Sequence, residues 1–188
     1  MILPIVKYGH PVLWQKGERI ASVTPEITRL IKDMFETMYD AAGIGLAAQQ
    51  VGRPLQLTVI DVREVKDRPS SLELDGKEAD VAALMPLVLI NPELRPFGDP
   101  VAGPEGCLSF PEIYEDITRH PFVEVKALNE KGAPLHFTAG GLLARAIQHE
   151  VDHLNGILFI HRMSSKAKQS LKAELEALQA VTKAALKG

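Results

Sequence analysis

The sequence predicts a single α+β domain over residues 1–188, with antiparallel or mixed sheets around a central helix and a second helix near the carboxyl end. Three observations support this fold class. A chain of 188 residues suits one domain. Its 46% hydrophobic and 24% charged residues are close to the globular average. The helical and strand-like segments do not alternate regularly, which favours α+β over α/β.

Three segments have helical patterns. Residues 24–41 begin with Thr24 at the N-cap and Pro25 in the first turn, followed by apolar residues at helical spacing. Residues 141–154 form the predicted central helix, and Asn155-Gly156 suits a left-handed cap after it. The third helix covers about residues 165–186.

The strand candidates are rich in β-branched residues or alternate in polarity. They are residues 55–62, 87–90, 122–128 and 135–138. A hairpin turn is expected at 129–132. Residues 63–80 contain 10 charged residues out of 18, so we expect an inserted surface loop there.

Composition excludes several classes of protein. With 21 basic and 24 acidic residues, the net charge of −3 gives no general reason to bind nucleic acid. No apolar run approaches the roughly 18–20 residues of a membrane span. The amino end does not read as a signal or transit peptide, so a cytoplasmic location is expected. Cys107 is the single cysteine, which excludes an internal disulfide.

The sharpest motif is His149-Glu-Val-Asp-His153 on the central helix. Residues at i and i+4 share a helix face, so both imidazoles can reach one metal ion. Glu150 then lies beside the metal and can take a proton from water. A central metal-binding helix is therefore predicted.

A catalytic metal site normally has three protein ligands, so one ligand is missing from this motif. Phe159 stands where metzincin proteases have their third histidine. Glu174 is spaced like a gluzincin ligand but is better interpreted as a solvated helix charge. Cys107, after Gly106, is the remaining candidate because a thiolate binds Zn²⁺ or Fe²⁺ well. An HExxH-type zinc endopeptidase is the alternative enzyme, and a cysteine-protease dyad is a competing use of the thiol.

A third segment, Gly43-Ile-Gly-Leu-Ala-Ala-Gln-Gln-Val-Gly52, nominally matches a dinucleotide-binding fingerprint. That fingerprint follows a strand and opens a helix, whereas this segment follows a helix and precedes a strand. It is better interpreted as a tight loop and edge segment whose backbone can approach a ligand. Gln50 offers a neutral amide donor at its end.

These three segments, GIGLAAQQVG, EGCLS and QHEVDHLNG, resemble the signature motifs of the peptide deformylase family. Their order and separation also fit that family, and the similarity extends over nearly the whole chain. The resemblance implies hydrolysis of the N-formyl group from the initiator methionine of new proteins, with release of formate. The implied substrates are N-formyl-methionyl peptides.

The resemblance also assigns roles to individual residues. It implies that Cys107, His149 and His153 bind one divalent metal ion, with water as fourth ligand. Fe²⁺ is the expected native metal, and Zn²⁺ or Ni²⁺ can replace it. Glu150 would be the general acid/base. The Gln50 side chain and the Leu108 backbone N–H would hold the substrate oxygen as it becomes anionic.

Substrate contacts follow from spacing together with the resemblance. Leu142, Arg145 and Ala146 share a helix face with His149 and are expected to line the methionine pocket. The stem of Arg145 is expected to pack while its charge reaches solvent. Ile44 and Gly45 are expected to pair with the substrate backbone in strand fashion.

Two further expectations come with the family. An arginine 12 residues after Cys107, here Arg119, is expected to pair with Asp152. In the family the terminal helix can dock on the ribosome, and residues 162–188 carry six basic and two acidic residues, a net charge of +4. The sequence alone favours a solvated helix face over such docking. The non-enzymatic alternative for the whole chain is a ribosome-associated binding protein with a residual metal site. No membrane partner and no direct nucleic-acid specificity are expected.

Overall fold

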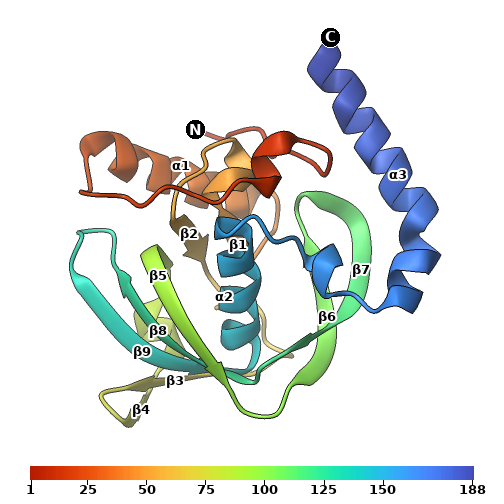
Figure 1. Ribbon diagram of the computed structural model, residues 1–188. Coiled ribbons are helices and arrows are strands. Elements are labelled where there is room, and N and C mark those ends of the chain that lie inside the picture. Colours follow the sequence, from red (N-terminus) through yellow and green to blue (C-terminus); the bar gives the residue numbers. More distant parts are fainter.

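The computed structural model describes residues 1–188 and contains three α-helices and nine strands (Figure 1). The helices are α1 (Pro25–Asp40), α2 (Gly141–Leu154) and α3 (Ser165–Lys187). The strands are β1 (Gly45–Ala47), β2 (Leu57–Ile60), β3 (Ser70–Leu74), β4 (Lys77–Ala79), β5 (Leu87–Phe97), β6 (Val101–Cys107), β7 (Phe110–Arg119), β8 (Phe122–Leu128) and β9 (Pro134–Gly140). The predicted α+β class is confirmed.

The strands form two sheets. The larger has seven strands in the order β1-β2-β5-β8-β9-β3-β4, and β6 pairs with β7 in a separate two-stranded sheet. Every paired strand is antiparallel to its neighbour. The sequence predicted antiparallel or mixed sheets, and both sheets are antiparallel.

Helix α2 lies in the middle of the molecule, between the large sheet and the β6–β7 hairpin (Figure 1). Its apolar residues, including Leu143, Ile147 and Leu154, join a core cluster with residues of the large sheet. The same helix buries four polar side chains: Gln148, His149, Glu150 and His153. Burying so many polar groups is costly unless they have partners or a function.

The other two helices lie further from this centre. Thr24 caps α1 by accepting a hydrogen bond from the Ile27 N–H (3.3 Å), as predicted. The buried face of α1 packs against β2 and β5. Helix α3 has no buried residue, and its apolar contacts with the body come from Ala167, Leu171, Leu175 and Leu178. No helix combines the length and apolar character needed to cross a membrane.

Residues 63–80 correct a prediction, because they are not simply a loop. They contain β3 and β4, and β3 pairs with β9 at the far side of the large sheet. Leu72 is only 2% exposed and belongs to the core. One inward leucine among many charged residues anchors this strand, so charge content misled the prediction.

Strands β6 and β7 were not predicted at all. Their inward residues do not alternate regularly: Phe110, Ile113 and Ile117 are the buried apolar positions of β7, spaced by three and four residues. The pairing register shifts between Gly106 and Cys107. A bulge of this kind breaks the period of two on which strand prediction depends.

Candidate active site

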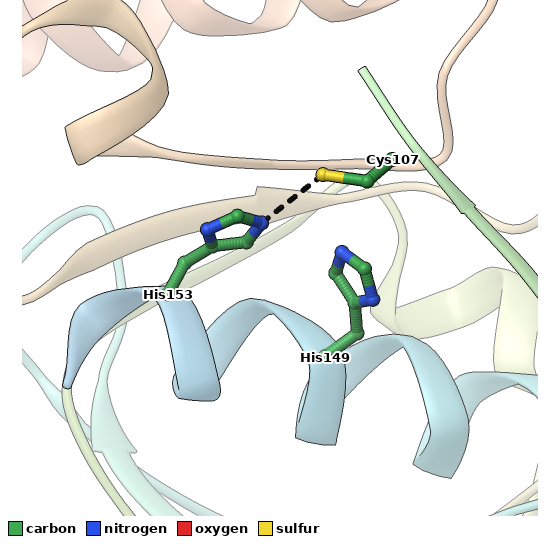
Figure 2. Close-up of side chains that lie close together, drawn as sticks. All are labelled: Cys107, His149 and His153. Carbon is green, nitrogen blue, oxygen red and sulfur yellow. Dashed lines mark hydrogen bonds between the residues drawn. The ribbon is translucent and has the colours of Figure 1, made fainter. Parts of the chain in front are cut away.

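Three potential metal ligands converge between α2 and the end of β6. His149 and His153 occupy successive turns of α2, and both rings point towards Cys107 (Figure 2). The Cys107 Sγ lies 3.3 Å from His153 Nε2. One ligand atom from each of the three residues lies within 4.8 Å of the other two. The i, i+4 spacing predicted this shared face.

A buried carboxylate orients the first histidine. His149 Nδ1 lies 2.8 Å from Glu105 Oε1, and an ionised carboxylate only accepts, so Nδ1 carries the proton. The other ring nitrogen, Nε2, lies on the side of Cys107 and is the atom that a metal ion would bind. Metal-bound histidines typically have such a carboxylate behind them, because it fixes the tautomer and the ring orientation.

The second histidine is held neutral. Burial, followed by the nearby His149, lowers the pKa of His153 well below its ordinary value. Its Nδ1 is buried without a hydrogen-bond partner. A neutral imidazole presents a lone pair, so the two rings and one thiolate form a donor set that suits Zn²⁺ or Fe²⁺. The residues present therefore fit a catalytic metal ion.

Glu150 lies beside these ligands. Its Oε1 is 4.0 Å from His149 Nε2, and its buried Oε2 has no hydrogen-bond partner. Burial raises the pKa of Glu150 to about 7. A carboxyl group that titrates near neutral pH can both take up and release a proton. Gly45 makes room for it, since a Cβ there would lie 2.7 Å from Glu150 Oε1.

The Gln50 side chain is fixed with its amide nitrogen towards the thiol. Gln50 Oε1 accepts a hydrogen bond from the Ala47 N–H (2.9 Å). Gln50 Nε2 then donates to Ser109 Oγ (3.2 Å) and lies 3.6 Å from Cys107 Sγ. A preset donor therefore faces the metal-ligand cluster.

A cleft of about 480 Å³ opens in front of these groups. Every site residue predicted from the sequence lines it except His153, which lies beneath Cys107. The lining residues among them are Ile44, Gly45, Gln50, Cys107, Leu108, Leu142, Arg145, Ala146, His149 and Glu150. Lys7, Arg68 and Tyr114 also line the cleft and were not predicted.

The expectation for the Arg145 charge was wrong. Its guanidinium does not extend into solvent but turns into the β6–β7 hairpin, where it donates to Ile117 O (2.7 Å) and Val101 O (2.8 Å). It also donates to Glu105 Oε2 (2.9 Å). Because its donors are directed at the hairpin and at Glu105, which also lines the cleft, Arg145 offers the cleft its stem rather than free N–H groups.

The expected ion pair between Arg119 and Asp152 is confirmed, with Nη1 2.6 Å from Oδ2. The same guanidinium donates two hydrogen bonds to Glu105, at 2.8 and 2.9 Å. Burial alone would raise the pKa of Glu105, but the bonds from His149 and Arg119 lower it well below its ordinary range. Sequence reasoning missed Glu105, because β6, the strand that carries it, was not predicted.

The residues weighed as protease ligands lie elsewhere. Phe159 is buried in an apolar cluster with Phe110 and Leu158, and Glu174 is exposed on α3. Neither belongs to the ligand cluster. The zinc endopeptidase alternative is therefore not favoured.

Comparisons with known proteins agree on one family. A family model described as Polypeptide deformylase matches residues 2–169. Peptide deformylase of Opitutus terrae is 46% identical, covering 100% of this chain and 98% of the relative. That of Methylacidiphilum infernorum is 49% identical, covering 95% and 94%. A crystal structure of a Synechococcus elongatus peptide deformylase in complex with actinonin superposes with a TM-score of 0.76 at 42% identity, covering 91% and 85%.

Proposed function

The chain belongs to the peptide deformylase family, and from this membership we propose which of its residues carry the family's reaction. The enzyme is a metal-dependent hydrolase that removes the N-formyl group from the N-terminal formyl-methionine of newly made proteins and releases formate. The convergence of Cys107, His149 and His153 beside the buried Glu150 is the observation that carries the assignment of residues.

Cys107, His149 and His153 would hold one divalent metal ion. When bound, such an ion lowers the pKa of a coordinated water and polarises a carbonyl oxygen. One thiolate and two imidazoles accept Fe²⁺, Zn²⁺ or Ni²⁺. Fe²⁺ is our proposal for the native ion, and its support is the similarity of the three motifs to the family.

Glu150 is proposed as the general acid/base. It accepts a proton from the attacking water and gives it to the amine that leaves. Two features support this role: the free Oε2 in the buried pocket, and a pKa raised to about 7 by burial. The proton can then be both taken and returned near neutral pH.

Gln50 Nε2 and the Leu108 N–H are proposed to hold the substrate oxygen as negative charge develops on it. The support for Gln50 is its fixed orientation, anchored by the Ala47 N–H. Donors aimed in advance at a developing oxyanion contribute roughly 3–4 kcal/mol each. Leu108 follows Cys107 directly and lines the same cleft.

The substrate would lie along the open edge of the large sheet. β1 is the first strand in the sheet order, so its outer edge has no strand partner. Ile44 and Gly45 at this edge line the cleft and offer backbone groups to an extended peptide. The methionine side chain would enter between Leu142, Ala146 and the stem of Arg145.

Exchanging Glu150 for glutamine tests the acid/base assignment. We expect Glu150→Gln to keep its metal, because Glu150 is not a ligand, and to lose roughly 10²–10⁴-fold in turnover. Formate release from a formyl-Met peptide, measured anaerobically with metal analysis, gives both numbers. Glu93→Gln, on the exposed side of β5, is the control for the amide substitution. Turnover retained by Glu150→Gln would refute the assignment.

We further propose that the enzyme works in the cytoplasm and that α3 docks on the ribosome. Helix α3 has no buried residue, and most of it lies beyond the residues matched by the family model. Its basic excess would bind ribosomal phosphates in a salt-sensitive manner. Cosedimentation with ribosomes should be lost when the chain is truncated before Ser165 and should weaken as salt rises. Equal cosedimentation of the truncated chain would remove the idea.

A further inference from the structure

The guanidinium of Arg145 donates hydrogen bonds to four acceptors, all of them on the β6–β7 hairpin. The side chain leaves α2 one turn before His149 and reaches across to the β6–β7 hairpin. Nη1 donates to Ile117 O (2.7 Å), Glu105 Oε2 (2.9 Å) and Gly103 O (3.4 Å). Nη2 donates to Val101 O (2.8 Å). One side chain of α2 is thus tied to both strands of the hairpin.

The backbone of β6 leaves space for this group. A Cβ built on Gly103 would lie 2.9 Å from Arg145 Nη2 and 3.0 Å from its Cζ. Those distances are shorter than real contacts of a methyl group. The guanidinium therefore lies flat against Gly103, and any side chain at that position would displace it.

Glu105 connects Arg145 to the metal ligands. Its Oε2 accepts hydrogen bonds from Arg145 Nη1 and Arg119 Nε, while its Oε1 faces His149 Nδ1 and Arg119 Nη2. The carboxylate is nearly fully buried, so its position is set by these contacts alone. Arg119, on β7, donates to both oxygens of Glu105. Arg145 donates to one of them from α2, the helix that also carries His149.

We propose that Arg145 is a positioning residue that joins the two elements bearing the metal ligands and fixes Glu105 behind His149. Cys107 is on β6, while His149 and His153 are on α2, and Arg145 is hydrogen-bonded to both β6 and β7 from α2. The inference rests on the proposed metal site. In this proposal Arg145 acts on His149 through Glu105, whereas the sequence indicated only that Arg145 lines the methionine pocket.

An arginine suits this position better than any other residue. Its planar fork presents five donors in fixed directions, so it can satisfy one carboxylate and several carbonyls at once. A lysine has its three donors on one nitrogen and cannot replace Nη1 and Nη2 together, which here reach Ile117 O and Val101 O. A leucine fills the pocket wall but makes none of these hydrogen bonds.

The test is the affinity of the metal-free protein for Zn²⁺, measured by competition with a chromophoric chelator. We expect Arg145→Leu to bind Zn²⁺ about 10- to 100-fold more weakly, since residues behind metal ligands typically contribute that much. Arg145→Lys keeps the stem and a charge and should show a smaller loss. If the leucine variant does not fold, the lysine variant provides the test. Arg95→Leu, at an exposed ion pair on β5, is the matched control and should bind as the unaltered chain does.

Gly103→Ala provides an independent route to the same defect. The added methyl group should displace the guanidinium and weaken Zn²⁺ binding although Arg145 is still present. In an Arg145→Leu background, the same substitution should have no further effect, because both changes remove one set of contacts. The absorption bands of bound Co²⁺ should shift in both single variants, which a purely structural loss of stability would not produce.

Two results would overturn the proposal. One is Zn²⁺ affinity in folded Arg145→Leu and Arg145→Lys equal to that of the unaltered chain. The other is recovery of affinity in the Gly103→Ala, Arg145→Leu double variant, which would show that Arg145 only fills space. The metal site itself is tested separately by Cys107→Ser. If that variant binds Zn²⁺ as tightly as the unaltered chain, the ligand assignment fails instead.

Discussion

At the scale of single residues, the site depends on small residues that leave space for the catalytic side chains. Gly45 illustrates this best. Its Cα lies against the carboxylate of Glu150, and no side chain fits between them. A glycine in a signature motif is often interpreted as a flexible point. Here the need is for space, because a Cβ at Gly45 would occupy the place of the Glu150 carboxylate, the proposed acid/base.

Gly45→Ala should therefore reduce activity without unfolding the protein. The methyl group would lie 2.7 Å from Glu150 Oε1 and force the carboxylate to move. A displacement of about 1 Å in a catalytic group can cost on the order of 100-fold in rate. Formate release and urea unfolding of the same preparation measure the two effects.

Gly76→Ala is the matched control for that substitution. Gly76 lies in the β3–β4 turn with φ +74°, and nothing lies within 4 Å of a Cβ built there. Left-handed backbone disfavours alanine by about 1 kcal/mol, so stability should fall while formate release is unchanged. If Gly45→Ala loses stability but keeps its rate, the steric interpretation of Gly45 is wrong.

At the scale of elements, the amino end of α2 is capped from outside the helix. Gly140 at its N-cap has no side chain to offer. The Leu142 N–H instead donates to Pro69 O (3.0 Å) and the Leu143 N–H to Ser70 Oγ (3.0 Å). The segment 63–80 therefore satisfies the second and third N–H groups of the helix that bears both histidines, while the first, that of Gly141, donates to Pro121 O (3.2 Å).

Ser70→Ala should destabilise the protein by about 1 kcal/mol, the usual cost of losing a helix cap. The reason is the unpaired Leu143 N–H that would remain at the start of α2. Chemical denaturation measures the change. Ser170→Ala on the exposed helix α3 is the control and should change the free energy of unfolding by less than about 0.5 kcal/mol. Equal effects of both substitutions would contradict the capping role.

The helices show how far sequence patterns reach. The predicted helices 24–41, 141–154 and 165–186 agree closely with α1, α2 and α3. The first showed an N-cap signal and a long apolar stripe, and the second was followed by an Asn-Gly cap. β3 was hidden by charged neighbours, and β6 and β7 by their irregular spacing. The metal-ligand cluster was nevertheless predictable from local motifs. The turn of Arg145 into the hairpin was not, since it depends on a glycine 42 residues away in the chain.

At the scale of the whole molecule, a hydrogen bond from α1 and an adjacent ion pair hold the segment that follows β2. Asp61 follows β2 and is nearly buried. It accepts hydrogen bonds from the Tyr39 hydroxyl of α1 (2.7 Å) and from Arg63 Nη2 (2.6 Å). Burial alone would raise the pKa of Asp61, but the bonds from Arg63 and Tyr39 outweigh it and lower the pKa.

This contact predicts a pH dependence of stability. Since the folded pKa of Asp61 lies below its ordinary value of 3.8, its contribution is complete above that value and is lost as the pH falls through the folded pKa. The free energies of unfolding of the unaltered chain and of Asp61→Asn should differ at pH 6, and the difference should shrink as the pH falls below 3.8 towards the folded pKa. Urea titrations over that range measure both. Curves that stay parallel would show that Asp61 carries no such linkage.

The open edge of β1 also has a consequence for timing. A strand edge accepts only a partner whose own backbone groups are free, so a chain end already folded into a helix or sheet cannot pair with it. If substrates pair with this edge as proposed, the enzyme competes with the folding of every protein it processes. Proteins whose first residues fold early would leave the enzyme little time to remove the formyl group. Proteins whose first residues fold slowly or stay unstructured would leave it more time.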